Sequence, residues 1–156
     1  MGLARAADGA CPEVGSLTRG AARLFRAFGQ QVLREVPLPD GRRADLVALA
    51  PDDRLTIIEV KSGLADFRAD QKWHSYRAFC DRLVFAVPAG FPMTLVPEEV
   101  GIAVVDGEGG VLLRAAAEHP LPASRRRALV GRFARLAAAR VEALIDPWGR
   151  PGARWI

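Results

Sequence analysis

Arg43-Ala44-Asp45-Leu46 and Ile57-Ile58-Glu59-Val60-Lys61-Ser62 are the two stretches that decide the fold of this chain. Side chains alternate between the two faces of a β-strand, so Glu59 and Lys61 project to one side of the expected strand and Val60 to the other. A carboxylate and an ammonium on one face of an otherwise apolar strand are costly to bury for stability alone. The pattern therefore indicates a functional site.

A tight turn brings the two stretches together. Pro51-Asp52-Asp53 separates the strands expected over 44–49 and 55–61, and so short a connection implies antiparallel neighbours. Residue 52 lies midway between positions 45 and 59, so Asp45 and Glu59 are expected to face each other across the strand pair. Their carboxylates would then be close enough to share one cation.

Paired carboxylates beside a lysine suit the hydrolysis of a phosphodiester. Mg²⁺ prefers oxygen ligands, commonly one or two carboxylates with waters and substrate phosphate, and Mn²⁺ can substitute. We expect Asp45 and Glu59 to hold the metal with the backbone carbonyl of Val60, and Lys61 to orient the attacking water or to neutralise phosphate charge. The alternative is a solvated strand face on which Glu59 pairs with Lys61 or with another neighbour.

The rest of the chain predicts an α/β fold. Strands 31–38, 44–49 and 55–61 form an antiparallel meander, and strand 83–87 lies parallel to the last of these because a helix intervenes. The other expected elements are a helix over 16–28 capped by Ser16 and stopped at Gly29, a helix over about 66–80, a hairpin of 101–106 with 111–114, and a helix over 124–145 capped by Ser124.

These elements divide the chain into a flexible arm over 1–15, one domain over 16–145 and an irregular tail over 146–156. The net charge is +4 and the isoelectric point about 9.8, which fits a polyanionic partner, although a compositional bias toward arginine is the alternative. Cys11 and Cys80 are the only cysteines, and no apolar run is long enough to cross a membrane. We therefore expect a cytoplasmic, nucleoid-associated protein.

The two quoted stretches resemble the core of the PD-(D/E)XK nuclease superfamily. More narrowly, 66–73 with Tyr76, Cys80-Asp81 and 83–87 resembles the MmcB-like family of bacterial DNA-repair proteins, and the likeness covers about 17–115. It implies a restriction-endonuclease-like fold: a mixed four-stranded core sheet flanked by helices, here with an added C-terminal strand pair and long helix. It also implies Mg²⁺-dependent endonuclease activity in DNA repair, with Asp45 and Glu59 as metal ligands and Lys61 as the catalytic lysine.

One departure from the superfamily pattern leaves an alternative open. Many active members place a glutamate on the first helix, but the helix expected over 16–28 has no acid. A one-metal site is therefore expected rather than a two-metal site. The rival function is a noncatalytic DNA-binding or scaffold protein of a repair complex that keeps the fold, and an RNA-directed nuclease is a third. A homodimer or a repair-complex partner is compatible with the nuclease functions and with the scaffold function.

Basic residues outside the pair are candidate DNA contacts. The helix over 124–145 carries many arginines, and a solvated basic face is the alternative to phosphate contacts. We expect DNA contacts from Lys72, Arg43, Arg125, Arg126 and Arg132. The apolar face of this helix is expected at Leu129, Phe133, Leu136, Val141 and Leu144.

Asp66 is expected as an N-cap, Asp70 as a first-turn acid, and Trp73 and Tyr76 as core residues.

Overall fold

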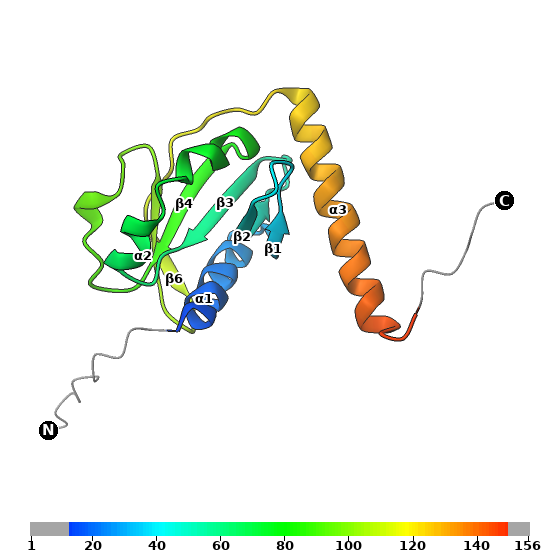
Figure 1. The fold of residues 1–156 in the computed structure, drawn as a ribbon, viewed down its shortest axis with the longest axis horizontal. Coiled ribbons are helices and arrows are strands. Elements are labelled where there is room, and N and C mark those ends of the chain that lie inside the picture. Colours follow the sequence, from blue (N-terminus) through cyan, green and yellow to red (C-terminus); the bar gives the residue numbers. More distant parts are fainter. Residues whose placement is uncertain (1–12, 150–156) are drawn as a thin grey trace, which may run out of the picture.

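Six strands form one mixed sheet in the order β1-β2-β3-β4-β5-β6 in a computed structural model that describes residues 13–149 (Figure 1). The elements are α1 (Val14–Ala27), β1 (Gln31–Pro37), β2 (Arg43–Leu49), β3 (Leu55–Val60), α2 (Leu64–Ala69), the 3₁₀ helix η1 (Trp73–Phe79), β4 (Arg82–Val87), the 3₁₀ helix η2 (Met93–Leu95), β5 (Gly101–Val105), β6 (Gly110–Arg114) and α3 (Ala123–Ile145). Every strand boundary lies within one residue of its predicted position.

The strand directions follow from the length of each connection. β1, β2 and β3 pair antiparallel through short turns, β3 to β5 pair parallel through longer crossovers, and β5 and β6 form an antiparallel hairpin. The directions of β1 to β4 and of the β5–β6 hairpin agree with the prediction, whereas the sequence gives no expectation for the parallel pairing of β5 with β4. The sheet has six strands rather than the predicted four, however, because β5 of the added strand pair joins β4 and the hairpin extends the same sheet.

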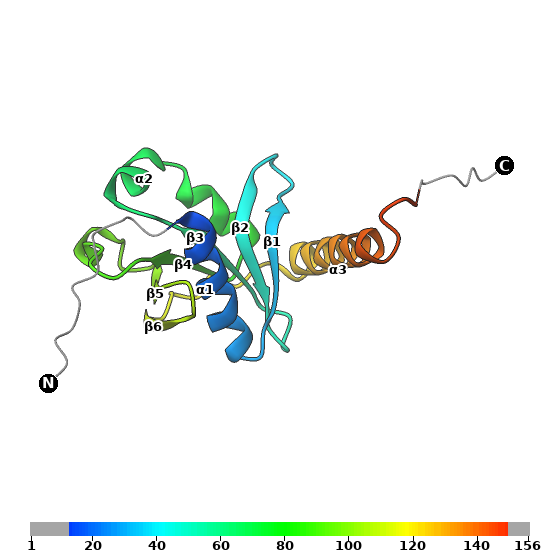
Figure 2. The same ribbon diagram turned by 90° about the horizontal axis from the view of Figure 1, so that it is seen from below.

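Helices cover the sheet on both sides (Figure 2). The α1 face of the sheet packs against Leu17, Ala21 and Phe25 of α1. The opposite face, called here the η1 face, packs against α2, η1 and the first half of α3 through Phe67, Tyr76 and Phe133, among other residues. Because both faces are covered, all six residues of β3 are buried, including Glu59. Among residues 13–149, no helix combines the length and apolar character needed to cross a membrane.

The single helix predicted over 66–80 is wrong. α2 ends at Ala69, and η1 begins only at Trp73. The break has a physical cause: the Asp70 carboxylate accepts the backbone N–H of Lys72 and the ammonium of Lys61, and Asp70 itself leaves the helical conformation at φ −92° and ψ 86°. A tertiary ion pair therefore interrupts an otherwise helical pattern.

Three predicted caps are also wrong. α1 begins at Val14 after Glu13, and α3 begins at Ala123 after Pro122, so Ser16 and Ser124 lie inside their helices. Asp66 is not an N-cap, because α2 follows Gly63. Its carboxylate instead accepts the backbone N–H of Ser62 at 3.0 Å from the first turn of α2. The stop at Gly29, which has φ +76°, agrees with the prediction.

Only the first half of α3 packs apolar side chains on the sheet, and the rest extends past the β1 edge (Figure 2). There Arg140 still donates to the backbone oxygens of Arg34 and Glu35 in β1. Leu129 and Phe133 are buried, and Leu136 is partly buried. Val141 and Leu144 are 53% and 82% exposed, so the predicted apolar face is only half covered. The predicted arm over 1–15 lies outside the described residues except for 13–15, where α1 has already begun, and the predicted tail lies outside them from residue 150 onward.

The Gly20→Ala variant is expected to lose about 1–3 kcal/mol of stability through overpacking. A Cβ at Gly20 would lie 1.8 Å from the backbone oxygen of Asp106 in the β5–β6 turn, so α1 would have to move away from the turn. Gly15→Ala is the matched control in the same helix, because a Cβ there meets nothing within 4 Å. Urea unfolding of both variants measures the difference, and equal stabilities would contradict the close approach.

Candidate metal centre

The candidate centre lies where β2 and β3 separate on the η1 face. Their paired register ends at Leu46↔Ile58, which agrees with the pairing predicted from the turn. One residue further on, side chains replace the backbone ladder. The N–H of Asp45 donates to Glu59 Oε1 at 3.2 Å, and the N–H of Val60 donates to Asp45 Oδ2 at 2.8 Å. These crossed bonds fix both carboxylates on adjacent strands.

Burial makes both carboxylates difficult to ionise. Burial is the main cause that raises the pKa of Glu59 from 4.5 to about 8, and the neighbouring charge of Asp45 adds to it. The pKa of Asp45 is raised as well, again chiefly by burial. Backbone N–H donors and the Lys61 ammonium act in the opposite direction on both groups. Without a further positive charge, two ionised carboxylates at this position are costly.

Lys61 lies beside the pair but already has a partner. Its side chain is 6% exposed, and its Nζ donates to Asp70 Oδ2 at 2.5 Å. Burial opposes ionisation of Asp70, yet the hydrogen bond from Lys61 leaves the pKa of that carboxyl below its usual value. Asp70 thus holds the Lys61 ammonium on the η1 face. Sequence reasoning placed Asp70 in a helix turn and missed this contact; the only signal was an acid nine residues after the lysine.

Tyr76 is the second residue near the centre that sequence reasoning missed, because it predicted Tyr76 only as a core residue. It is buried, as predicted, and its phenol donates to the backbone oxygen of Arg43 at 3.5 Å, close enough to Glu59 for the two side chains to interact. Burial raises the pKa of this phenol, and the charges of Glu59, Asp70 and Asp45 raise it further. Tyr76 therefore stays protonated near the Glu59 carboxylate. Tyr76 lies on η1, which follows the break after α2 that the sequence pattern did not reveal.

The two carboxylates match the coordination that Mg²⁺ commonly has in proteins. Residues 13–149 contain no group of three or more His, Cys, Asp or Glu side chains that could hold a metal ion. Asp45 and Glu59 nevertheless satisfy the usual requirement of one or two carboxylates, with water and phosphate completing the octahedron. The raised pKa values of Asp45 and Glu59 also favour a cation at this position, because a divalent cation would offset the repulsion between the two carboxylates.

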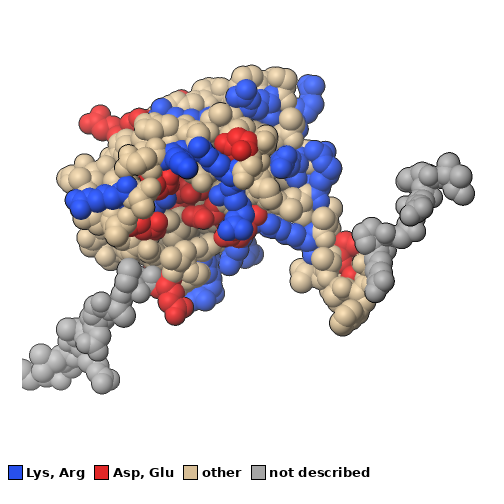
Figure 3. Space-filling view, viewed as in Figure 1, with Lys and Arg blue, Asp and Glu red and all other residues tan. Residues whose placement is uncertain are grey.

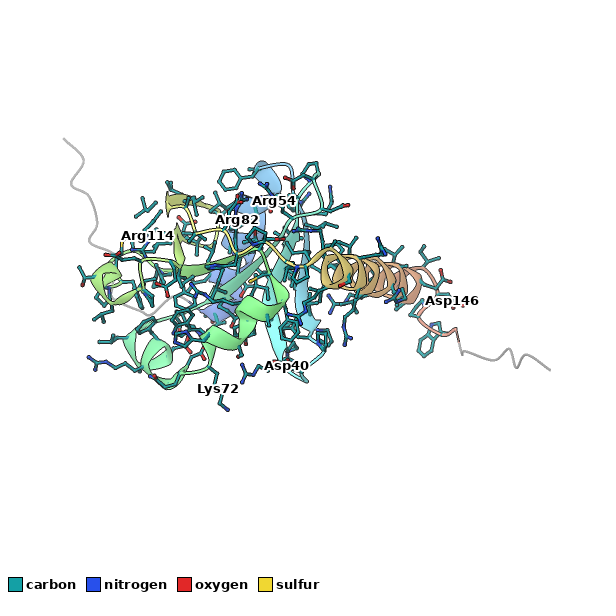
Figure 4. All side chains as sticks on the ribbon, turned by 90° about the horizontal axis from the view of Figure 1, so that it is seen from above. Asp40, Arg54, Lys72, Arg82, Arg114 and Asp146 are labelled. Atoms are coloured by element: carbon teal, nitrogen blue, oxygen red, sulfur yellow. The ribbon has the colours of Figure 1, made fainter. Side chains whose placement is uncertain are left out.

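The structure gives the predicted DNA contacts different roles. Arg126 donates to both oxygens of the buried Asp81 at 2.6 and 2.7 Å, so this arginine anchors α3 rather than facing a ligand. Arg43 pairs with Glu35. Lys72 is exposed and points away from the fold on the side that carries Asp40 (Figure 4).

Two predicted arginines of α3, together with Arg135, line a hollow of about 420 Å³ between α3 and η1. Arg125 also donates to the backbone oxygen of Ala78, and Arg132 to that of Pro37. The floor of the hollow is apolar, with Phe79 and Leu129 among its residues. In Figure 3, basic side chains gather on the half of α3 nearer the sheet.

Metal-free protein is expected to lose stability as the pH rises from 5 to about 8. Between the ordinary pKa of 4.5 and the folded-state pKa of about 8 for Glu59, the folded state binds more protons than the unfolded state, so stability falls with rising pH. The loss should reach about 2–4 kcal/mol, given roughly 1.4 kcal/mol for each pKa unit. Urea unfolding in EDTA across this range measures it. A flat profile would contradict the buried, repelling pair, and added Mg²⁺ should restore stability at pH 8.

The chain as a whole resembles known proteins. The family model described as "DNA repair protein MmcB-like" matches residues 5–148. A solved structure, the SPO1766 protein of unknown function from Silicibacter pomeroyi, is 39% identical, with a TM-score of 0.83, over 90% of this chain and 97% of that one. A search of curated proteins finds no match.

Proposed function

The chain belongs to the MmcB-like family of DNA repair proteins, and from that premise we propose that it is a Mg²⁺-dependent endonuclease of the PD-(D/E)XK type acting on DNA. The family suggests a role in DNA repair. The observation that carries the catalytic part is the crossed pair of Asp45 and Glu59, both desolvated and both with raised pKa, beside the Lys61 ammonium. An arrangement that is costly without a cation and favourable with one supports a metal site.

Each side chain would have a separate task. Asp45 and Glu59 would hold the cation, with the Val60 carbonyl as a further oxygen donor, and the Asp45 N–H would orient the Glu59 carboxylate. When bound, Mg²⁺ polarises the phosphodiester and lowers the pKa of a coordinated water. The Lys61 ammonium has three N–H donors and gives one to Asp70, so two remain for the attacking water or a nonbridging phosphate oxygen.

The η1 face also offers a path for the substrate. The arginine-lined hollow between α3 and η1 lies on the same face of the sheet as the carboxylate pair. Lys72 adds an exposed ammonium beside η1. A DNA backbone that crosses η1 could therefore contact Arg125 and Arg132 while one phosphodiester reaches the pair. Arg126 takes no part in this path, because Asp81 occupies its guanidinium.

The direct test is a panel of labelled nicked, flapped, branched and crosslinked DNA duplexes incubated with Mg²⁺, Mn²⁺ or EDTA. Cleavage of at least one form in either metal and of none in EDTA is the expected result. Competition with matched RNA tests whether the substrate is DNA. Calorimetry with Mn²⁺ alone provides a second readout that does not depend on choosing the right substrate.

The rival function is a noncatalytic DNA-binding or scaffold protein of a repair complex. One observation favours it: α1 carries no acid, so the described residues supply only two carboxylates to the cation. If no DNA form is cut and calorimetry detects no Mg²⁺ or Mn²⁺ binding, the endonuclease proposal fails and the scaffold function replaces it.

A further inference from the structure

A second basic surface lies on the other side of the sheet, between α1 and the edge strand β1. Four arginines and Gln31 line a hollow of about 570 Å³ there, and none of its lining residues is acidic. Arg34 projects to this side because it is paired with Leu46, whose side chain belongs to the α1 face. The arginines are Arg19, Arg23 and Arg26 of α1 and Arg34 of β1.

The charge of this hollow is only partly compensated. Arg19 donates to the backbone oxygen of Gly107, which leaves its charge in place, and Arg23 pairs with Glu108 at 2.8 Å. Arg26 and Arg34 are exposed, and within residues 13–149 neither guanidinium has a hydrogen bond or an ion pair. Arginines gathered around one hollow repel one another unless an anion lies between them. The hollow is therefore suited to a phosphate-bearing ligand.

We propose that this α1–β1 hollow binds the sugar-phosphate backbone of a second nucleic-acid segment, separate from the segment at the carboxylate pair. Arg19 and Arg26 are seven residues apart, about 10 Å along a helix axis. One strand of duplex DNA carries a charge about every 3.4 Å of axis. The row of arginines thus matches about three successive phosphates rather than one small anion. Five N–H donors on each guanidinium suit phosphate oxygens without reading the bases.

The position of the hollow separates it from the proposed catalytic surface. The carboxylate pair and the hollow lined by Arg125, Arg132 and Arg135 lie on the η1 face, so the sheet stands between them and the α1–β1 hollow. One straight duplex cannot lie against both faces. The inference shares its partner, DNA, with the proposed function but does not depend on metal binding or cleavage.

The test compares binding of a labelled 20-base-pair duplex by the whole protein in EDTA, at salt concentrations from about 50 to 300 mM. Without a cation, the carboxylate pair offers a phosphate no positive charge, so the binding that remains reports surfaces that need no metal. The double variant Arg26→Gln/Arg34→Gln is expected to bind about tenfold more weakly at the lowest salt. Its slope of log affinity against log salt should be shallower by about two, one unit for each lost phosphate contact.

Arg127→Gln is the matched control, since Arg127 is exposed on α3 and lines neither hollow. Its affinity and slope should stay close to those of the wild type. If the double variant keeps the wild-type slope, or if it loses calorimetric binding of inorganic phosphate while duplex affinity is unchanged, the second DNA surface is overturned. Loss of DNA cleavage in a carboxylate variant would leave this result untouched, so the two proposals can fail separately.

Discussion

Replacing Glu59 by glutamine is expected to abolish Mg²⁺-dependent cleavage, with a loss of about 10³-fold or more in kcat. Glutamine keeps the size of the side chain and an oxygen that can accept the Asp45 N–H, but it removes the charge that would hold the cation. Labelled-duplex cleavage under single-turnover conditions measures the effect, and calorimetric Mn²⁺ binding should weaken in parallel. Asp45→Asn should behave in the same way.

Glu98→Gln is the matched control for this change, because Glu98 is exposed and lies outside the candidate centre. The Glu59→Gln protein should remain folded. In EDTA at pH 8 it should be more stable than the wild type, since a buried carboxylate that repels Asp45 has been removed. If Glu59→Gln cuts DNA within a few-fold of the wild type, the proposed metal centre is wrong, whatever the family.

Replacing Asp81 by asparagine is expected to cost about 3–5 kcal/mol of unfolding free energy. The residue is 1% exposed, and its two oxygens accept the backbone N–H groups of Leu55 and Leu121 and both terminal nitrogens of Arg126. Asparagine leaves the Arg126 charge without its partner and offers one carbonyl oxygen to four donors. Urea unfolding at pH 7 measures the loss, and α3 should detach first because Arg126 anchors it.

Asp52→Asn is the control for Asp81, because Asp52 forms an exposed ion pair with Arg54 in the β2–β3 turn. Such a pair contributes about 0–1 kcal/mol. Since hydrogen bonds lower the pKa of Asp81 despite its burial, the stability it provides should be present at neutral pH and lost as the pH falls below the ordinary value of 3.8. If Asp81→Asn loses no more unfolding free energy than Asp52→Asn does, α3 is held by its apolar contacts alone.

Local patterns were enough to predict the strands, the directions of β1 to β4 and of the β5–β6 hairpin, and the pairing of Asp45 with Glu59. Each of these depends on residues close in the chain: the turn at Pro51-Asp52-Asp53 sets the β2–β3 register, and alternation sets the face of each side chain. The failures involve distant partners. The break at Asp70 depends on Lys61, and the half-exposed face of α3 depends on where the sheet ends.

The sequence by itself determined that an acidic pair and a lysine share one strand face, because a period of two residues needs no knowledge of the rest of the fold. Only the tertiary structure decided what surrounds them. It pairs Lys61 with Asp70, brings Tyr76 near Glu59 and pairs Arg126 with Asp81. It also places the arginines of α1 and β1 around one hollow on the α1 face of the sheet. The physical reason is that charges and hydrogen-bond donors choose partners by distance in space, and the packing of the helices on the sheet sets those distances.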